Sequence, residues 1–369
     1  MKVTSRLALA GMCLVFPFAA SANCLSAYSN YLSGGIFAAD ALSSQPECFG
    51  GGATTSQVMV NATAGQQSLA ISDNLARRWT VPGAPAVAGG AAGRGMAAGD
   101  ALPALNLWTS AADEDTDQRF GNVAGNTTKN DFDIQNYIVG ADFGLSPALI
   151  LGASLAIDKG DISGISTAVG AEENELSSSG FMLAPYLGWQ LNEQWALDAS
   201  VGIGEGELDA SDSSRQDVDR WYAGANLNYQ RWLGSWQFSG RFSYLHAEES
   251  YDDIRLRGET QQQLGGLQKL QDSDATNELD RIQLGGQVGY WWNGWLPYAG
   301  LHYMDDVHRS TTQDFAPSDP IGREAWIWAL GVNYLSLAHG VSAGLAYEQE
   351  EGRGNQDLNT WMANLNLRF

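Results

Sequence analysis

The chain lacks several features that most protein classes depend on. Lysine and arginine together number only 20 against 42 acidic residues, which gives a formal net charge of −22. Nucleic acid is therefore an improbable partner, because its phosphates require basic side chains, and basic patches for a membrane surface are equally scarce. After residue 22, no apolar run is long enough to cross a bilayer as a helix.

The N-terminal residues predict export. Lys2 and Arg6 precede an apolar run, and small residues occupy the cleavage positions, so residues 1–22 are expected to be a signal peptide. Cleavage there leaves two cysteines, Cys24 and Cys48. An even pair in an oxidising compartment predicts one disulfide within the segment 23–53.

The feature that is abundant is alternating polarity. In residues 147–158, for example, Leu151, Ala153 and Ile157 share one face, whereas Ser154 and Asp158 lie on the other. Such alternation over about ten residues is typical of strands in a transmembrane barrel. Twelve segments show it, near 105–110, 132–144, 147–158, 180–191, 195–205, 220–232, 235–247, 279–292, 296–304, 324–336, 340–349 and 358–369.

The connections between these segments alternate in length. Short ones lie at 145–147, 191–194, 233–235, 293–295 and 337–340, and long acidic ones at 111–131, 159–179, 206–219, 248–278 and 305–323. A barrel with tight periplasmic turns and large extracellular loops has this pattern, for which a soluble β-sandwich gives no reason. We therefore predict an all-β fold: a twelve-stranded antiparallel transmembrane β-barrel over residues 104–369.

Two further segments precede the barrel. Residues 54–80 have small side chains at three- and four-residue spacing, which predicts a slender α-helix suited to the pore. Residues 81–103 are rich in Pro, Gly and Ala and read as a linker. The last strand carries Leu365, Leu367 and Phe369 on one face and is expected to close against the first, which leaves no sheet edge in lipid.

In this order, helix, linker and barrel ending in Phe resemble the translocator, or β-domain, of the autotransporters. Stretches such as "YIVGADFGLSPALILGASLAI" and "WLPYAGLHY" look like strands and turns of that family. The resemblance covers residues 54–369 and implies a monomer in outer-membrane lipid and lipopolysaccharide. It also implies that residues 23–53 lie at the cell surface, and that the barrel-assembly machinery recognises Leu365, Leu367 and Phe369.

The resemblance assigns the pore helix to Ser72, Asp73, Asn74, Leu75, Ala76, Arg77, Arg78 and Trp79. Protease-type autotransporters cut themselves in a similar segment, between two adjacent Asn residues. Here Asp73 stands at the first of those positions, which puts cyclisation chemistry at that bond in doubt. Arg77 and Arg78 are instead expected to pair with acidic residues of the lumen. The family also usually carries a passenger of several hundred residues, whereas the segment 23–53 is short.

Candidates for catalysis or metal binding are weak. A catalytic Asp–His site is conceivable among His302, Asp305, Asp306 and His308 at an outer strand end. Asp113, Asp115 and Asp117 have the spacing that opens a calcium loop, but Gln118 replaces the required Gly. No GxSxG, HExxH or phosphate-binding glycine loop is present. We therefore expect no enzyme activity, no cofactor and no dedicated metal site.

The favoured function is that of an autotransporter β-domain that exports and anchors its own N-terminal segment. One alternative is a plugged porin-like channel, in which residues 23–80 remain periplasmic or act as a plug. A second alternative is an adhesin that acts through the long acidic loops, especially 248–278.

Overall fold

The computed structural model describes residues 25–34, 58, 61–79, 105–121, 127–166, 174–210, 214–312, 321–336 and 340–369. The signal peptide, both cysteines of the predicted disulfide and the linker 81–103 lie outside these residues. Among the residues described, none of the helices combines the length and the apolar character needed to cross a membrane.

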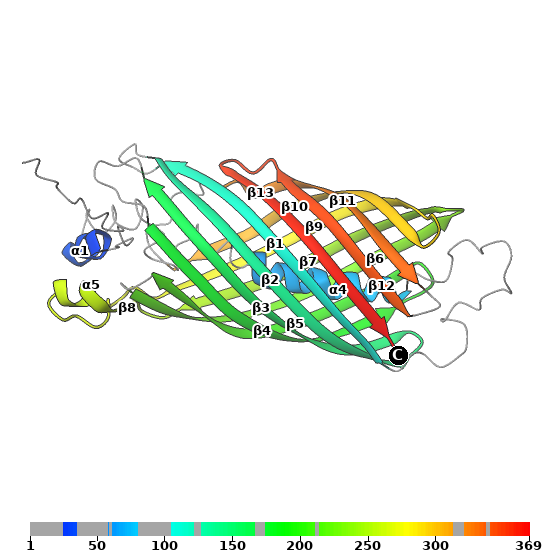
Figure 1. Ribbon diagram of the computed structural model, residues 1–369, viewed down its shortest axis with the longest axis horizontal. Helices are drawn as coiled ribbons and strands as arrows, with labels where there is room; N and C mark the ends of the chain where they lie inside the picture. Colours follow the sequence, from blue (N-terminus) through cyan, green and yellow to red (C-terminus); the bar gives the residue numbers. More distant parts are fainter. Residues whose placement is uncertain are drawn as a thin grey trace, which may run out of the picture.

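Twelve long antiparallel strands form a closed barrel (Figure 1). Each strand pairs with its neighbours along the chain, and β1 pairs with β13 to close the sheet. The long strands are β1 (Leu105–Gly121), β2 (Thr127–Ser146), β3 (Leu149–Ser166), β4 (Asn174–Gln190), β5 (Trp195–Ala210), β6 (Ser214–Leu233), β7 (Trp236–Tyr251), β9 (Ala275–Tyr290), β10 (Trp295–Thr311), β11 (Glu324–Ser336), β12 (Val341–Glu351) and β13 (Gln356–Arg368). A two-residue strand, β8 (Arg255–Leu256), pairs with the start of β6.

The predicted fold and strand number are confirmed, but the strands are longer than the sequence indicated. Most of the stretch 111–131 belongs to β1 and β2, although it was expected to be a loop. The stretches 159–179 and 206–219 are likewise largely strand, and β10 extends into the stretch 305–323 as far as Thr311. Beyond the apolar band β1 carries polar residues on both faces, and in β2 the apolar residues Phe132 and Ile134 point inward. The outward apolar alternation that marks a membrane strand is therefore lost there.

Outward and inward residues alternate as a membrane barrel requires. Leu151 and Ile157 of β3 are nearly half exposed on the outer surface, whereas Ser154 and Asp158 point inward and are buried. Exposed aromatic residues form two girdles, one with Trp189, Trp195, Trp236 and Trp295, the other with Trp221, Trp326 and Trp361. The apolar outer surface between the girdles is therefore the lipid-facing band.

The two ends of the barrel differ. The short turns and Phe369 lie at one end, while the long connection between β7 and β9, with α5 (Gly258–Gln263), and α1 (Leu25–Ser33) lie at the other (Figure 1). Tight turns face the periplasm and long connections face the exterior in such barrels. We therefore refer to these as the inner end and the outer end.

Candidate functional site

A helix occupies the lumen of the barrel (Figure 1). It consists of one π-helical turn, η2 (Asn61–Gly65), followed by α4 (Gln66–Trp79). Val58 is also helical, and residues 54–57, 59, 60 and 80 of the predicted helix lie outside the described residues. Its N-terminal end lies towards the outer end and Trp79 towards the inner end, so the chain runs inward through the barrel.

The helix packs against one side of the wall, formed by β1, β2 and β4–β6. Small residues on the strands allow this close approach. A Cβ atom at Gly188 would lie 2.8 Å from the ring of Trp79, and one at Gly224 would lie 2.5 Å from Oγ of Ser68. Side chains at these two positions would displace the helix.

At its inner end the helix is fixed through Asp142 of β2. One carboxylate oxygen of Asp142 accepts hydrogen bonds from the side-chain amides of Asn74 (2.9 Å) and Asn106 (3.0 Å) and from the hydroxyl of Tyr186 (3.0 Å). Arg78 forms an ion pair with the other oxygen. The buried carboxylate thus has both a counter-ion and several donors, as a charge in the lumen requires.

The middle of the helix is held by polar contacts to β5, β6 and β7. Oγ of Ser72 donates to Asp198 (2.8 Å), which also accepts from Asn226 (2.7 Å) and Asn228 (2.8 Å). Asp73 forms an ion pair with Arg241 of β7. These bonds fix the rotation of the helix about its axis, because each requires one particular face.

Towards the outer end the surroundings become apolar. The backbone carbonyl of Ala62 accepts a hydrogen bond from Asn136 (2.6 Å). Around Val58 and Ala62 the wall supplies an apolar collar, which we define as Phe132, Ile134, Ile162, Leu176, Leu208, Ala210, Val218, Tyr251 and Ala275. The collar packs against Val58 and Ala62 from the side of β2–β7 and β9, and the burial of apolar surface stabilises this contact.

Adjoining cavities, which share lining residues such as Asp73 and Tyr298, lie between the helix and the wall formed by β7 and β9–β13. The largest of the three along the helix has a volume of about 110 Å³ and is lined by Arg77, Arg241, Tyr298 and His302, among others. Two others have about 50 Å³ each. These spaces are lined by polar side chains and are large enough to hold ordered water.

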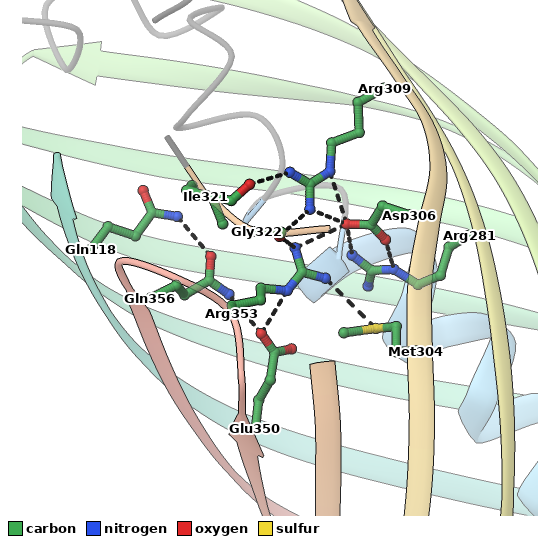
Figure 2. A network of polar contacts seen from close by, with 10 residues as sticks. All are labelled: Gln118, Arg281, Met304, Asp306, Arg309, Ile321, Gly322, Glu350, Arg353 and Gln356. Carbon is green, nitrogen blue, oxygen red and sulfur yellow. Dashed lines mark hydrogen bonds and ion pairs between the residues drawn. The ribbon is translucent and has the colours of Figure 1, made fainter. Parts of the chain in front are cut away.

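A second polar cluster closes the outer half of the lumen on that side (Figure 2). Asp306 of β10 is fully buried and pairs with three guanidinium groups: Arg281 Nε at 2.5 Å, Arg309 Nε at 2.9 Å and Arg353 at 2.9 Å. Nε of Arg353 also contacts Glu350 at 2.7 Å. We call these five residues the Asp306 cluster.

The Asp306 cluster joins segments that are distant in sequence. Its members come from β9, β10, β12 and the turn before β13, and Arg309 donates to the backbone carbonyl of Gly322 at 2.9 Å. Gln356 donates to Glu350 at 3.2 Å and accepts from Gln118 of β1 at 3.1 Å. The contacts therefore cross the seam where the first and last strands meet.

The catalytic grouping considered from sequence is wrong. His302 and Asp306 point into the lumen, but His302 lies near Arg241 and Asp73, whereas Asp306 is held by arginines. The pairing of β10 with β9 shifts in register between Asp305 and His308. His308 lies beyond this shift, is exposed and contacts Glu278 at 3.7 Å. The four residues thus do not share one site.

The calcium-loop pattern has a different explanation. Asp113, Asp115 and Asp117 are alternate residues of β1 that face outward, so they line a straight strand instead of a turn that could encircle an ion. Within the described part of the chain, no group of three or more His, Cys, Asp or Glu side chains could hold a metal ion.

The remaining predicted residues are placed as follows. Ser72, Asp73, Asn74, Leu75, Ala76, Arg77, Arg78 and Trp79 all belong to α4. Leu75 is fully buried, and the backbone carbonyl of Arg77 accepts from Arg368 of β13 at 2.7 Å. Leu365 and Phe369 are exposed on the outer surface, where Phe369 is 67% exposed.

The residues that hold the helix were not singled out from sequence. Asp142 and Asp198 are single charges on the inward faces of β2 and β5, and Arg241 shares the inward face of β7 with one other charge, Glu249. A charge at an inward position of a barrel strand is the signal that could have identified them, because it needs a partner within the lumen.

Comparison with known proteins gives consistent results. A family model described as "Autotransporter beta-domain" matches residues 107–348. Among solved structures, the translocator domain of autotransporter NalP from Neisseria meningitidis is similar, with a TM-score of 0.61 at 10% identity over 87% of this chain and 99% of that one. The β-domain of the Bordetella autotransporter BrkA has a TM-score of 0.51 at 15% identity over 72% and 100%.

The transport unit of the autotransporter AIDA-I from Escherichia coli is also similar, with a TM-score of 0.52 at 11% identity over 72% of this chain and 90% of that one. At these identities, the solved structures support the fold. No match was found among curated protein sequences.

Proposed function

We propose, from the premise that this chain belongs to the autotransporter β-domain family, that it exports its own N-terminal segment through the barrel and anchors it at the cell surface. Membership of the family confirms the resemblance noted in the sequence and assigns the barrel to the outer membrane. The porin-like alternative has less support, because the matching family is one of secretion modules.

The proposal rests on the direction of the pore helix. Its 5 and 14 residues in η2 and α4 span about 28 Å at 1.5 Å per residue, close to the roughly 30 Å of a bilayer core. A chain that passes through the lumen with its N-terminal end outermost has its preceding residues on the outer side. Residues 23–53 are accordingly the exported segment, 54–80 the pore helix and 81–103 the linker back to β1.

The lumen serves as an anchor in this proposal, without covalent chemistry. Asp73 has no side-chain amide nitrogen to attack its own backbone carbonyl, and its carboxylate is paired with Arg241. The helix therefore remains joined to the barrel. We further propose that the barrel is a monomer that contacts lipopolysaccharide at its outer end, and that Cys24 and Cys48 form a disulfide in the exported segment.

The first test is surface labelling of an epitope tag placed just after Asn23. We expect labelling on intact cells, and we expect the tag and the barrel to migrate as one chain on a denaturing gel. Labelling only after lysis, with the barrel confirmed in the outer membrane, would refute export in favour of a plugged porin. A tagged fragment separated from the barrel would refute the uncleaved anchor.

Phe369 is proposed to act in assembly, together with Leu365 and Leu367. Its backbone amide donates to the carbonyl of Leu105 at 3.1 Å, but its side chain is mostly exposed to lipid. The substitution Phe369→Ala is expected to change the free energy of unfolding by less than about 0.5 kcal/mol, as for most surface positions. In cells, however, the folded, heat-modifiable form should fall to a minor part of the chain.

The matched control for Phe369→Ala is Trp361→Ala, an exposed aromatic residue on the same strand. Gel shifts of boiled and unboiled outer-membrane fractions measure the folded fraction. Equal assembly of the two variants would argue against a specific role for Phe369.

A further inference from the structure

The connection between β7 and β9 has a defined fold of its own. Inside it, the backbone amide of Leu256 donates to Gln268 (2.8 Å) and that of Leu270 to Ile254 (2.9 Å), so the two sides of the connection run together. With β8 and α5 it forms a compact unit at the outer end (Figure 1). We call residues 252–274 the outer platform.

Asp253 stabilises this unit from within. Its carboxylate accepts from the backbone amides of Ser273 and Asp274, both at 3.1 Å, and pairs with Lys269 at 3.0 Å. Partial burial would raise the pKa of Asp253, but these bonds outweigh that effect and hold the pKa below its usual value. The carboxylate is thus ionised at neutral pH, and the platform has its shape through its own contacts.

The α1 helix packs on the outer platform. Ala27 and Tyr28 have no exposed surface and belong to one apolar cluster with three platform residues, Ile254, Leu256 and Leu270. Tyr31 lies at the edge of the same cluster. On its other side, α1 is exposed, with Leu32 at 48%. The helix thus has one covered face, and the platform is what covers it.

Two tyrosine hydroxyls fix the position of α1. Oη of Tyr28 lies 2.6 Å from Oγ of Ser214 at the start of β6, and Oη of Tyr31 donates to the backbone carbonyl of Asp272 at 2.6 Å. The pKa of Tyr31 is raised by burial and by the charges of Asp272, Asp253 and Asp274, which keeps its hydroxyl a donor. Each bond joins residues about two hundred positions apart in the chain.

A helix of nine residues has little stability alone, because nucleation is unfavourable and isolated helices shorter than about 12–15 residues are marginal in water. The ordered α1 therefore depends on the surface that it covers. The chain is also held at Val58 and Ala62, at the outer end of the pore helix, which pack within the apolar collar. The exported segment thus has contacts to the outer half of the barrel both within it, at α1, and just after it.

We propose that the outer platform is the docking site for the N-terminal segment of this same chain, through Tyr28 and Tyr31 of α1. The exported segment then forms a cap on the barrel instead of extending freely from it. This inference rests on the proposed export, because α1 reaches the platform only from the outer side. Residues 248–278, considered above for adhesion, would then bind α1 of the same chain.

The test is hydrogen exchange by mass spectrometry on the full mature chain in nanodiscs. The amides of α1 are expected to be protected in the wild type. In Tyr28→Ser and in Leu270→Asp they should exchange at least about tenfold faster, because an undocked helix of this length opens freely. The matched control is Gln262→Asp, an exposed position on the platform, which should leave the protection of α1 unchanged.

Two readouts keep the outcomes separate. The platform amides of Leu256 and Leu270 should stay protected in Tyr28→Ser, which shows that the platform itself remains folded. Unprotected α1 in the wild type, or equal protection in the wild type and Tyr28→Ser, would overturn the docking. Surface labelling of the tag after Asn23 is measured in the same strains. If intact cells are labelled but the amides of α1 exchange rapidly in the wild type, docking is refuted and export is not. If labelling requires lysis, export itself is refuted.

Discussion

Replacement of Asp306 by alanine is expected to lower the free energy of unfolding by about 3–5 kcal/mol, the usual cost of removing one partner from a buried ion pair. Asp306 is fully buried, and its carboxylate contacts the guanidinium groups of Arg281, Arg309 and Arg353 (Figure 2). In the variant, the only acidic side chain left in the Asp306 cluster is Glu350, which contacts Arg353 at 2.7 Å. Its single negative charge cannot balance the charges of three arginines.

The measurement is urea unfolding of the purified chain, followed by tryptophan fluorescence. Asp305→Ala is the matched control, because Asp305 precedes Asp306 and points to the outside of the strand. Its effect should lie within about 0.5 kcal/mol, as for an ordinary surface substitution. Asp306→Asn keeps the shape and one of the two acceptor oxygens, so it removes the charge together with the hydrogen bonds to the other oxygen. Equal stability of the two alanine variants would show that the Asp306 cluster does not bear on unfolding.

Deletion of residues 61–79 is expected to raise single-channel conductance by on the order of tenfold, because a helix with its side chains occupies a cylinder about 10–12 Å wide. In the intact barrel, α4 occupies that volume, and the space left in the lumen beside it is that of the adjoining cavities described above. The remaining wall is closed by strand pairing at every position around the barrel, so it should persist without the helix.

Planar-bilayer recording of the purified barrel provides the measurement. Deletion of residues 25–33, which removes α1 and keeps the pore helix, is the control and should leave the conductance near that of the intact chain. An unchanged conductance after the longer deletion would mean that the helix is not what fills the lumen. The result concerns occupancy of the pore, and the side of the membrane reached by the N-terminus is decided by surface labelling.

The sequence predicted the barrel because lipid imposes a rule on each strand. Where the outside is hydrocarbon, as around Leu151 and Ile157 of β3, alternation is obligatory and easily seen. Above the membrane that rule ends. Asp113 and Asp115 face water and Glu114 faces the lumen, so β1 continues through a stretch without any apolar face. Its outer half was therefore mistaken for a loop.

The Asp306 cluster and the outer platform could not be predicted for a different reason. Arg281 and Asp306 come from β9 and β10 and Arg353 from the turn before β13, and only the folding of the sheet brings them together. In the same way, Tyr28 gains its partner Ser214 through folding across the whole chain. Contacts of this kind depend on register and tilt, which a single sequence does not specify.

The length of the strands determines how far the outer end stands from the lipid. β2 has 20 residues, and at about 3.3 Å per residue with a tilt of about 40° it rises about 50 Å. The lipid-facing band of such barrels is only about 25 Å tall, and the inner girdle adjoins the short turns. Most of the excess therefore projects outward, and α1 is held well clear of the headgroups. An antibody directed against α1 could thus approach from the side without steric hindrance from the bilayer.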